Sequence, residues 1–212
     1  MFLLLTLVLA TAKLPLIDVP ATRGSSDTLV VFVSGDGGWA KIDKAVSGVL
    51  ANEGMPVVGL NSLQYFWTKR TPESASRDLA SIIDTNLARW KKSNVVLVGY
   101  SRGADVLPAM VARLTPEQRS KIRLLALLAP SPRVEFEFHV ADWMHDSKRG
   151  LPVEPELAKL TTKTICVWGD DDDDSLCRGL ALPHVRVVTL HGSHHFDGDY
   201  AKLARIILEA LN

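Results

Sequence analysis

The chain has 212 residues, a length that suits one domain with a sizeable hydrophobic core. Its 24 lysines and arginines balance 24 aspartates and glutamates, so the formal net charge at pH 7 is zero. This balance gives no net basic field that would point to nucleic acid, and we expect no nucleic-acid partner.

The first residues have the pattern of an export signal. Residues 2–10 are apolar but too few to span a bilayer, and Ala10-Thr11-Ala12 follows them as an A-x-A cleavage pattern. No basic residue precedes the apolar run, which departs from an ordinary signal peptide. We expect residues 1–12 to be a signal-peptide remnant and the mature, exported chain to begin near Lys13; the alternative is a first strand.

Strands and helices alternate in the next part of the chain. Residues 13–20 alternate loosely in polarity and predict an edge strand, whereas the β-branched residues 28–33 predict a central, buried strand. A glycine-rich loop, Ser34–Trp39 (SGDGGW), follows this strand. The next predicted elements are a helix at 42–52, a strand at 55–60 and a helix at 71–92 that opens with Thr71 as N-cap and Pro72 at its first position.

The most informative stretch begins with an apolar run, residues 95–98, that predicts a short buried strand. Gly99-Tyr100-Ser101-Arg102-Gly103 comes next, and the small residues 104–114 predict a helix. This is the pattern G-x-S-x-G between a strand and a helix, a tight turn that exposes the serine hydroxyl. Ser101 is therefore the candidate nucleophile.

The second half repeats the alternation with one interruption. Residues 131–155 are mixed polar and aromatic and predict an insertion that overhangs the site. The regular elements are a strand at 123–128, a strand at 163–168, a short helix at 176–182, a strand at 185–190 and a final helix after its cap, Asp199. Strands that alternate with helices predict a mostly parallel sheet with helices on both faces, here an α/β-hydrolase fold in a single domain at 13–212 with a short lid-like insertion.

A serine nucleophile needs a base, and the base needs an acid that orients it. In the α/β-hydrolase order both follow the serine, the acid first, each in a loop after a later strand. The acid loop is the run Asp170–Asp174. Hydrolases of this fold often place the catalytic aspartate three residues after the loop glycine, here Gly169, which favours Asp172; Asp174 is the rival.

The base must come from the loop after the strand at 185–190. The run His194-His195-Phe196-Asp197-Gly198 resembles the His-Phe-Phe-x-Gly ending of some α/β-hydrolases, which favours His194 over His195. The other histidine would lie beside the site.

The oxyanion hole should combine the backbone N–H of Arg102 with a second N–H from the glycine-rich loop, which by position is that of Asp36. A P-loop is excluded because its Lys-Ser/Thr pair is absent. The side chain of Asp36 could in addition reach the α-ammonium of an aminoacyl ester; the alternative is that Asp36 only suits a turn.

Three other groups of residues bear on disulfide and metal chemistry. Cys166 and Cys177 flank the acidic run and would form a disulfide in an oxidising compartment; the alternative is two buried thiols. The alternating aspartates do not make an EF-hand, because Ser175 and Ala181 stand where glycine and glutamate belong. His139, Asp142 and His145 lack a further ligand, so we expect no metal and no cofactor.

Several of these motifs together resemble the VirJ/AcvB family of bacterial virulence proteins. They are Ser34–Trp39, the segment from Gly99 to Asp105, Asp174-Ser175-Leu176-Cys177 and the segment from His194 to Tyr200. The resemblance implies a periplasmic α/β-hydrolase. It also implies hydrolysis of lysyl-phosphatidylglycerol, an aminoacylated membrane lipid, and a link to type IV secretion, whose components or substrates would then be partners.

The leading expectation is therefore an exported serine esterase that acts on aminoacyl-phospholipid. The candidates for the lipid groove are aromatic residues together with an apolar neighbour, Met144: Tyr65, Phe66, Trp67, Phe136, Phe138 and Trp143. One alternative is a general carboxylesterase or thioesterase. Another is a non-enzymatic periplasmic binding factor of a secretion system, which would not need serine, acid and histidine in order.

Overall fold

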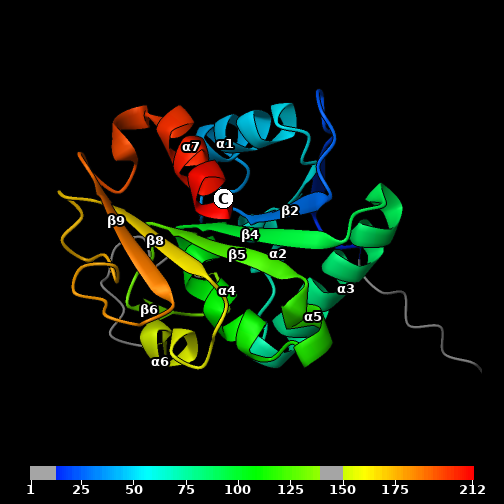
Figure 1. The fold of residues 1–212 in the computed structure, drawn as a ribbon. Coiled ribbons are helices and arrows are strands. Elements are labelled where there is room, and N and C mark those ends of the chain that lie inside the picture. The colour runs from blue at the N-terminus through cyan, green and yellow to red at the C-terminus, as the bar shows by residue number, and fades with distance from the viewer. Residues whose placement is uncertain (1–12, 139–149) are drawn as a thin grey trace, which may run out of the picture.

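The computed structural model describes residues 13–138 and 150–212 of the chain (Figure 1). The predicted leader, residues 1–12, lies outside them, as do His139, Asp142, Trp143, Met144 and His145. No helix within the two described ranges has the length and apolar character needed to cross a membrane.

Strands and helices alternate along the chain. In order the elements are β1 (Leu16–Val19), β2 (Thr28–Val33), α1 (Lys41–Asn52), β3 (Val57–Leu60), α2 (Ser62–Tyr65), α3 (Pro72–Trp90), β4 (Asn94–Tyr100), α4 (Arg102–Ala112), α5 (Pro116–Ser120), β5 (Ile122–Leu128), β6 (Arg133–Val134), β7 (Leu151–Pro152), α6 (Val153–Leu157), β8 (Thr164–Gly169), β9 (Val185–Leu190), a 3₁₀ turn (Phe196–Gly198) and α7 (Tyr200–Leu211).

Seven strands form one sheet in the order β1-β3-β2-β4-β5-β8-β9. Only β1 runs antiparallel to its neighbour in this sheet, and it lies at the edge as its loose alternation predicted. The other neighbours pair in parallel, with β4 between β2 and β5. Because parallel strands end at the same edge, the loops after β2, β4, β8 and β9 all open on one side of the molecule.

Helices cover both faces of the sheet, with α1 and α7 on one face and α3 and α4 on the other (Figure 1). Alternate residues of β4 supply the two cores: Val95 and Leu97 pack on the α3–α4 side, and Val96 and Val98 on the α1–α7 side. A strand buried on both faces must be apolar throughout, which explains the continuous run of valine and leucine. Ser101 thus directly follows a strand that is buried on both faces.

Helix caps agree with the predicted boundaries. The Thr71 side chain accepts a hydrogen bond from the Ser74 N–H at the start of α3, and the Asp199 side chain accepts one from Lys202 at the start of α7.

The prediction of a helix at 176–182 was wrong. The segment instead makes turns, because Leu176 N–H is bound by the Pro130 carbonyl and Gly179 takes a φ of +86°, which no right-handed helix accepts. Leu176, Cys177 and Leu180 are still buried, so the apolar spacing indicated burial correctly but not the backbone conformation.

The predicted insertion leaves the sheet after β5. Its described parts form a small antiparallel pair, β6 with β7, followed by α6, which packs against α4. The insertion therefore lies beside the helix that follows the nucleophile candidate.

Candidate active site

Ser101 occupies the sharp turn between β4 and α4, with φ 51° and ψ −122°. A non-glycine residue at positive φ is strained, and the surroundings have to impose it. The Ser101 N–H donates to the Leu128 carbonyl of β5, and the Ser101 carbonyl accepts from Asp105 in the first turn of α4. These two bonds hold the turn from both sides.

The two flanking glycines are required by close backbone approach. A Cβ on Gly99 would lie 2.4 Å from the Gly103 carbonyl oxygen, and one on Gly103 would lie 1.9 Å from the Val33 carbonyl oxygen. Strand β4, helix α4 and the end of β2 therefore meet within a distance that only glycine permits. This contact brings the loop after β2 to the serine.

The structure brings Ser101, His194 and Asp172 into one hydrogen-bonded chain. His194 Nε2 lies 3.0 Å from Ser101 Oγ, and His194 Nδ1 lies 2.8 Å from Asp172 Oδ2. The three residues come from the loops after β4, β9 and β8, whose ends share one edge of the sheet. A serine, a histidine and a carboxylate in this arrangement can transfer the serine proton to the imidazole.

The other aspartates of the acidic run have different surroundings. Asp170 accepts a hydrogen bond from the Gly192 N–H at 2.9 Å, and this bond lowers the pKa of Asp170. Asp170 also contacts His191 and raises the pKa of that histidine. Asp173 pairs with Arg178. Asp174 is exposed, and its side chain makes no hydrogen bond or ion pair to the described part of the chain. Of the two candidate acids, only Asp172 reaches a histidine of the site.

His195 lies beside the triad residues without joining them. Its Nδ1 is 2.6 Å from the Tyr100 hydroxyl, and its ring packs edge-on against His194. Burial raises the pKa of Tyr100 well above its usual value, and Tyr200, Asp43 and Asp172 raise it further. The phenol therefore keeps its proton and can donate it to His195. The role of Tyr100 was missed from the sequence, where it appears only as a variable position of G-x-S-x-G.

The glycine-rich loop after β2 lies against the serine as the oxyanion prediction requires. A Cβ on Gly35 would be 3.3 Å from the Ser101 Cβ. In the described part of the chain, the N–H groups of Asp36 and Arg102 donate to no carbonyl. Two unpaired N–H groups beside a serine hydroxyl can stabilise an oxyanion.

The Asp36 side chain has a partner that sequence reasoning did not foresee. Arg102 binds its carboxylate through Nε and Nη2. The contact between this carboxylate and a substrate ammonium stays a prediction, in which the ammonium would share the carboxylate with Arg102.

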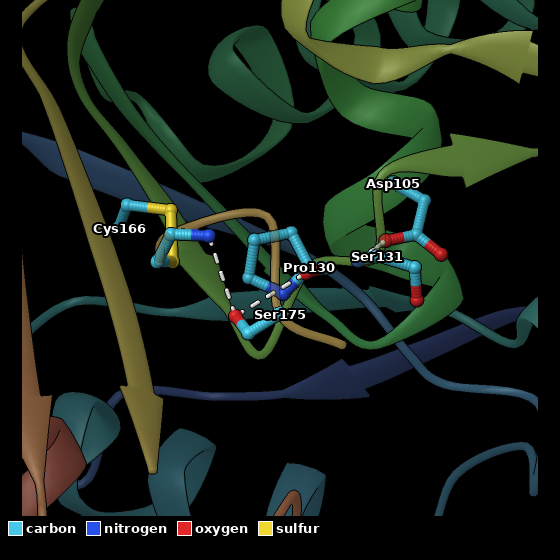
Figure 2. Close-up of a disulfide and its surroundings, with 6 residues drawn as sticks. Asp105, Pro130, Ser131, Cys166 and Ser175 are labelled. Carbon is cyan, nitrogen blue, oxygen red and sulfur yellow. Dashed lines mark hydrogen bonds between the residues drawn. A yellow bond between two sulfur atoms is a disulfide. The ribbon is translucent and has the colours of Figure 1, made fainter. Parts of the chain in front are cut away.

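The disulfide prediction is confirmed: Cys166 and Cys177 are bonded. Figure 2 shows the bridge beside Ser175, whose hydroxyl lies between the Pro130 carbonyl and the Cys177 N–H. The bond joins β8 to the segment just after the acidic run. The loop that carries Asp172 is thus closed at both ends.

A buried carboxyl, that of Asp105, lies in the first turn of α4 after Ser101. It accepts from the Ser131 N–H at 2.6 Å and so ties α4 to the start of the insertion (Figure 2). Burial raises its pKa well above the usual value for aspartate. Its position one helical turn after Ser101 is the only sequence signal that could have marked it.

The aromatic candidates for a lipid groove separate into two groups. Tyr65 and Phe66 are fully buried in the core and Phe136 is nearly so, which makes them packing residues. Trp67 is 65% exposed and stacks on Phe138 with ring centroids 5.7 Å apart. Only this pair offers apolar surface to a ligand among the described candidates.

Comparison with known proteins identifies the relatives of the chain. The family described as bacterial virulence protein (VirJ) matches residues 27–212. No curated protein matches the sequence.

Solved structures share the fold at low identity. Est1E from Butyrivibrio proteoclasticus with ferulic acid bound has a TM-score of 0.67 and 16% identity, over 94% of this chain and 96% of that one. MenH from S. aureus has a TM-score of 0.67 and 13% identity, over 92% of this chain and 97% of that one. Proline iminopeptidase of Mycobacterium smegmatis has a TM-score of 0.66 and 13% identity, over 92% of this chain and 94% of that one. The α/β-hydrolase fold predicted from the sequence is confirmed.

Proposed function

The chain belongs to the VirJ family of bacterial virulence proteins, and on that premise we propose that it is a serine hydrolase of carboxylic esters. The observation that carries the proposal is the hydrogen-bonded chain from Ser101 through His194 to Asp172. The neighbouring unpaired N–H groups of Arg102 and Asp36 support it, because ester cleavage needs both a nucleophile and an oxyanion site.

The proposed reaction has two steps. Ser101 Oγ attacks the ester carbonyl while His194 Nε2 takes its proton, and the oxyanion accepts hydrogen bonds from the two N–H groups. The carbonyl re-forms, the alcohol leaves with the proton from His194, and an acyl-serine remains. Water then attacks the acyl group with His194 again as base, which releases the acid and restores Ser101. Asp172 keeps Nδ1 protonated and stabilises the imidazolium throughout.

For the substrate we propose the aminoacyl ester of lysyl-phosphatidylglycerol. The family resemblance supports this choice. So does the acidic run beside His194, whose exposed members Asp171 and Asp174 place negative charge near the site, where a lysyl group would bring two positive charges. The exposed stack of Trp67 on Phe138 supplies an apolar surface for the lipid part.

We further propose that the protein acts in the periplasm, as a single catalytic domain at 13–212 that follows a leader at 1–12. The Cys166–Cys177 disulfide supports an oxidising compartment. A contribution to type IV secretion, through a change in membrane lipid or through contact with secretion components, belongs to the same proposal.

The test measures lysine released from vesicles of phosphatidylglycerol that contain lysyl-phosphatidylglycerol, with p-nitrophenyl butyrate as the neutral comparison. We expect the wild type to prefer the lipid in kcat/KM and Ser101→Ala to cleave neither. Equal or better turnover of the neutral ester would favour a general esterase over the lipid enzyme. No turnover of either ester, with Ser101→Ala indistinguishable from wild type, would favour a binding factor.

A further inference from the structure

The Arg102 side chain makes an unusual set of contacts for a residue next to a nucleophile. It is only 10% exposed, and it binds the Asp36 carboxylate through Nε and Nη2. Its Nη1 donates to the carbonyl of Glu135 at 2.7 Å and to that of Glu137 at 3.2 Å. A planar guanidinium suits this set because its five donors are fixed relative to one another.

The loop that this guanidinium reaches has little stiffness of its own. Asp36 lies between Gly35 and Gly37, and glycine gives the backbone more freedom than any other residue. The start of the loop is fixed, because the Ser62 N–H and hydroxyl both bond to Ser34. Its far side is closed by a bond from the Gly38 N–H to the Gly35 carbonyl. Asp36, at the tip, is held to the rest of the site through its carboxylate.

The two residues of this ion pair are the same two whose N–H groups are proposed to form the oxyanion hole. We propose that the Arg102 guanidinium is a positioning group, which fixes the Asp36 N–H relative to the Arg102 N–H by holding the Asp36 carboxylate. The inference rests on the proposed hydrolase function. An oxyanion hole is effective only when its donors are held in place before the reaction, and a shift of about 1 Å can cost a factor of about one hundred in rate.

The same side chain connects the hole to the insertion. Its two carbonyl acceptors lie in residues 135–137, and its guanidinium carbon is 6.0 Å from the centre of the Phe138 ring, which stacks on Trp67. Arg102 therefore joins the donor loop, the turn at Ser101 and the exposed aromatic pair. A neutral side chain would lose the ion pair with Asp36 and the cation–π contact with Phe138 together.

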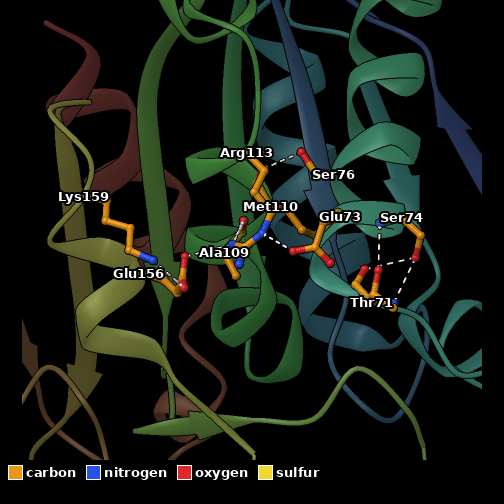
Figure 3. Close-up of polar contacts among 9 residues, drawn as sticks. All are labelled: Thr71, Glu73, Ser74, Ser76, Ala109, Met110, Arg113, Glu156 and Lys159. Carbon is orange, nitrogen blue, oxygen red and sulfur yellow. Dashed lines mark hydrogen bonds and ion pairs between the residues drawn. The ribbon is translucent and has the colours of Figure 1, made fainter.

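The chain offers a matched control at the other end of α4. Arg113, just past the opposite end of α4, also binds carboxylates, those of Glu73 and Glu156, and the Ala109 carbonyl (Figure 3). Arg113→Gln removes a comparable set of bonds far from Ser101. It reports what the loss of such an arginine does to the fold alone.

The experiment compares Arg102→Gln, Asp36→Asn, their double variant and Arg113→Gln. It measures kcat and KM on p-nitrophenyl acetate and the inhibition constant of a trifluoromethyl ketone, which forms an oxyanion on the serine. For Arg102→Gln we expect kcat to fall by about 10- to 100-fold, the ketone to bind more weakly by a similar factor, and KM to stay within about threefold. The double variant should be no worse than Arg102→Gln, because both changes break one interaction. Arg102→Lys, which keeps the charge without the fork, should recover part of the loss.

Several outcomes would overturn the positioning role. They are an unchanged kcat in Arg102→Gln, a loss equal to that in Arg113→Gln, a loss confined to KM, or independent losses that multiply in the double variant. Failure of the proposed function has a different signature. A wild type that cleaves p-nitrophenyl acetate no faster than Ser101→Ala would overturn the hydrolase, and with it the role of Arg102.

Discussion

The carboxylate of Asp172 lies 2.8 Å from Nδ1 of His194, and only 13% of the Asp172 side chain is exposed. The other nitrogen of that ring faces Ser101. One imidazole thus connects an acid and a hydroxyl from loops more than 70 residues apart in the chain, which fixes both its tautomer and its orientation.

Asp172→Asn should lower kcat by about a thousandfold or more without a comparable change in stability, because an amide favours the wrong histidine tautomer. Asp174→Asn is the matched control from the same run, and we expect its kcat to stay within about threefold of wild type. Steady-state rates on a p-nitrophenyl ester decide between them. A large loss in Asp174→Asn with a small one in Asp172→Asn would exchange the two assignments.

Substitution of the two adjacent histidines should have different effects on kcat. His194→Ala should reduce kcat to within about tenfold of Ser101→Ala, since both break the same unit. His195→Ala should keep most of the activity and lose about 1 kcal/mol of stability with the Tyr100 hydrogen bond. Tyr100→Phe removes that bond from the other side and should lose a similar amount. If His195→Ala were as inactive as His194→Ala, the base would have to be reassigned.

Much of this site could be predicted from the sequence because its signals are local. G-x-S-x-G between a strand and a helix places Ser101, and chain order alone places an acid loop and a histidine loop after it. Asp172 could not be separated firmly from Asp174, because the two have the same chemistry and only the loop geometry distinguishes them. That geometry includes bonds from the Asp172 N–H to the Gly169 carbonyl and from the Ser175 N–H to the Asp172 carbonyl.

The features that were missed are long-range or depend on backbone shape. The pairing of Arg102 with Asp36 joins positions 66 residues apart, and no periodicity reports it. The helix predicted at 176–182 was wrong because apolar spacing does not reveal the positive φ of Gly179. The burial of Tyr65 and Phe66 follows from the packing of the whole domain, not from the short aromatic run itself.

Removal of the disulfide should weaken both the fold and the site. Cys166→Ser with Cys177→Ser should lower the free energy of unfolding by about 3 kcal/mol in the loop-entropy estimate, and kcat should fall because the bond closes the loop that carries Asp172. Urea unfolding with and without dithiothreitol measures the loss in free energy of unfolding. The double serine variant, which has no disulfide, is the control, and dithiothreitol should not change its stability. Two thiols that alkylate freely in oxidised wild type would refute the bond.

The buried carboxyl of Asp43 on α1 predicts that the protein loses stability as the pH rises. Asp43 is fully buried; its Oδ2 accepts from the Ala40 N–H, and its Oδ1 has no partner within the described residues. Burial raises its pKa from 3.8 to about 6. The folded state therefore favours the protonated form, so ionisation costs stability as the pH rises from about 4 to 6, and the cost persists above pH 6.

Asp43→Asn imitates the protonated form and should stabilise the protein at pH 8 by about 1–3 kcal/mol. The gain should shrink below pH 6 and become small near pH 4, where the carboxyl is protonated in the folded state and about half protonated in the unfolded state. Urea unfolding of the two proteins at pH 8 and pH 4 tests this, since groups common to both cancel in the difference. A difference that does not change between the two pH values would contradict the raised pKa.

The central claim is that Ser101 is a nucleophile activated by His194. It is tested most directly by mass spectrometry of the intact protein after exposure to a fluorophosphonate, followed by peptide mapping. We predict one adduct, located on Ser101, absent from Ser101→Ala and formed at least about a hundredfold more slowly in His194→Ala. An adduct elsewhere, no adduct at all, or equal labelling of wild type and His194→Ala would contradict it.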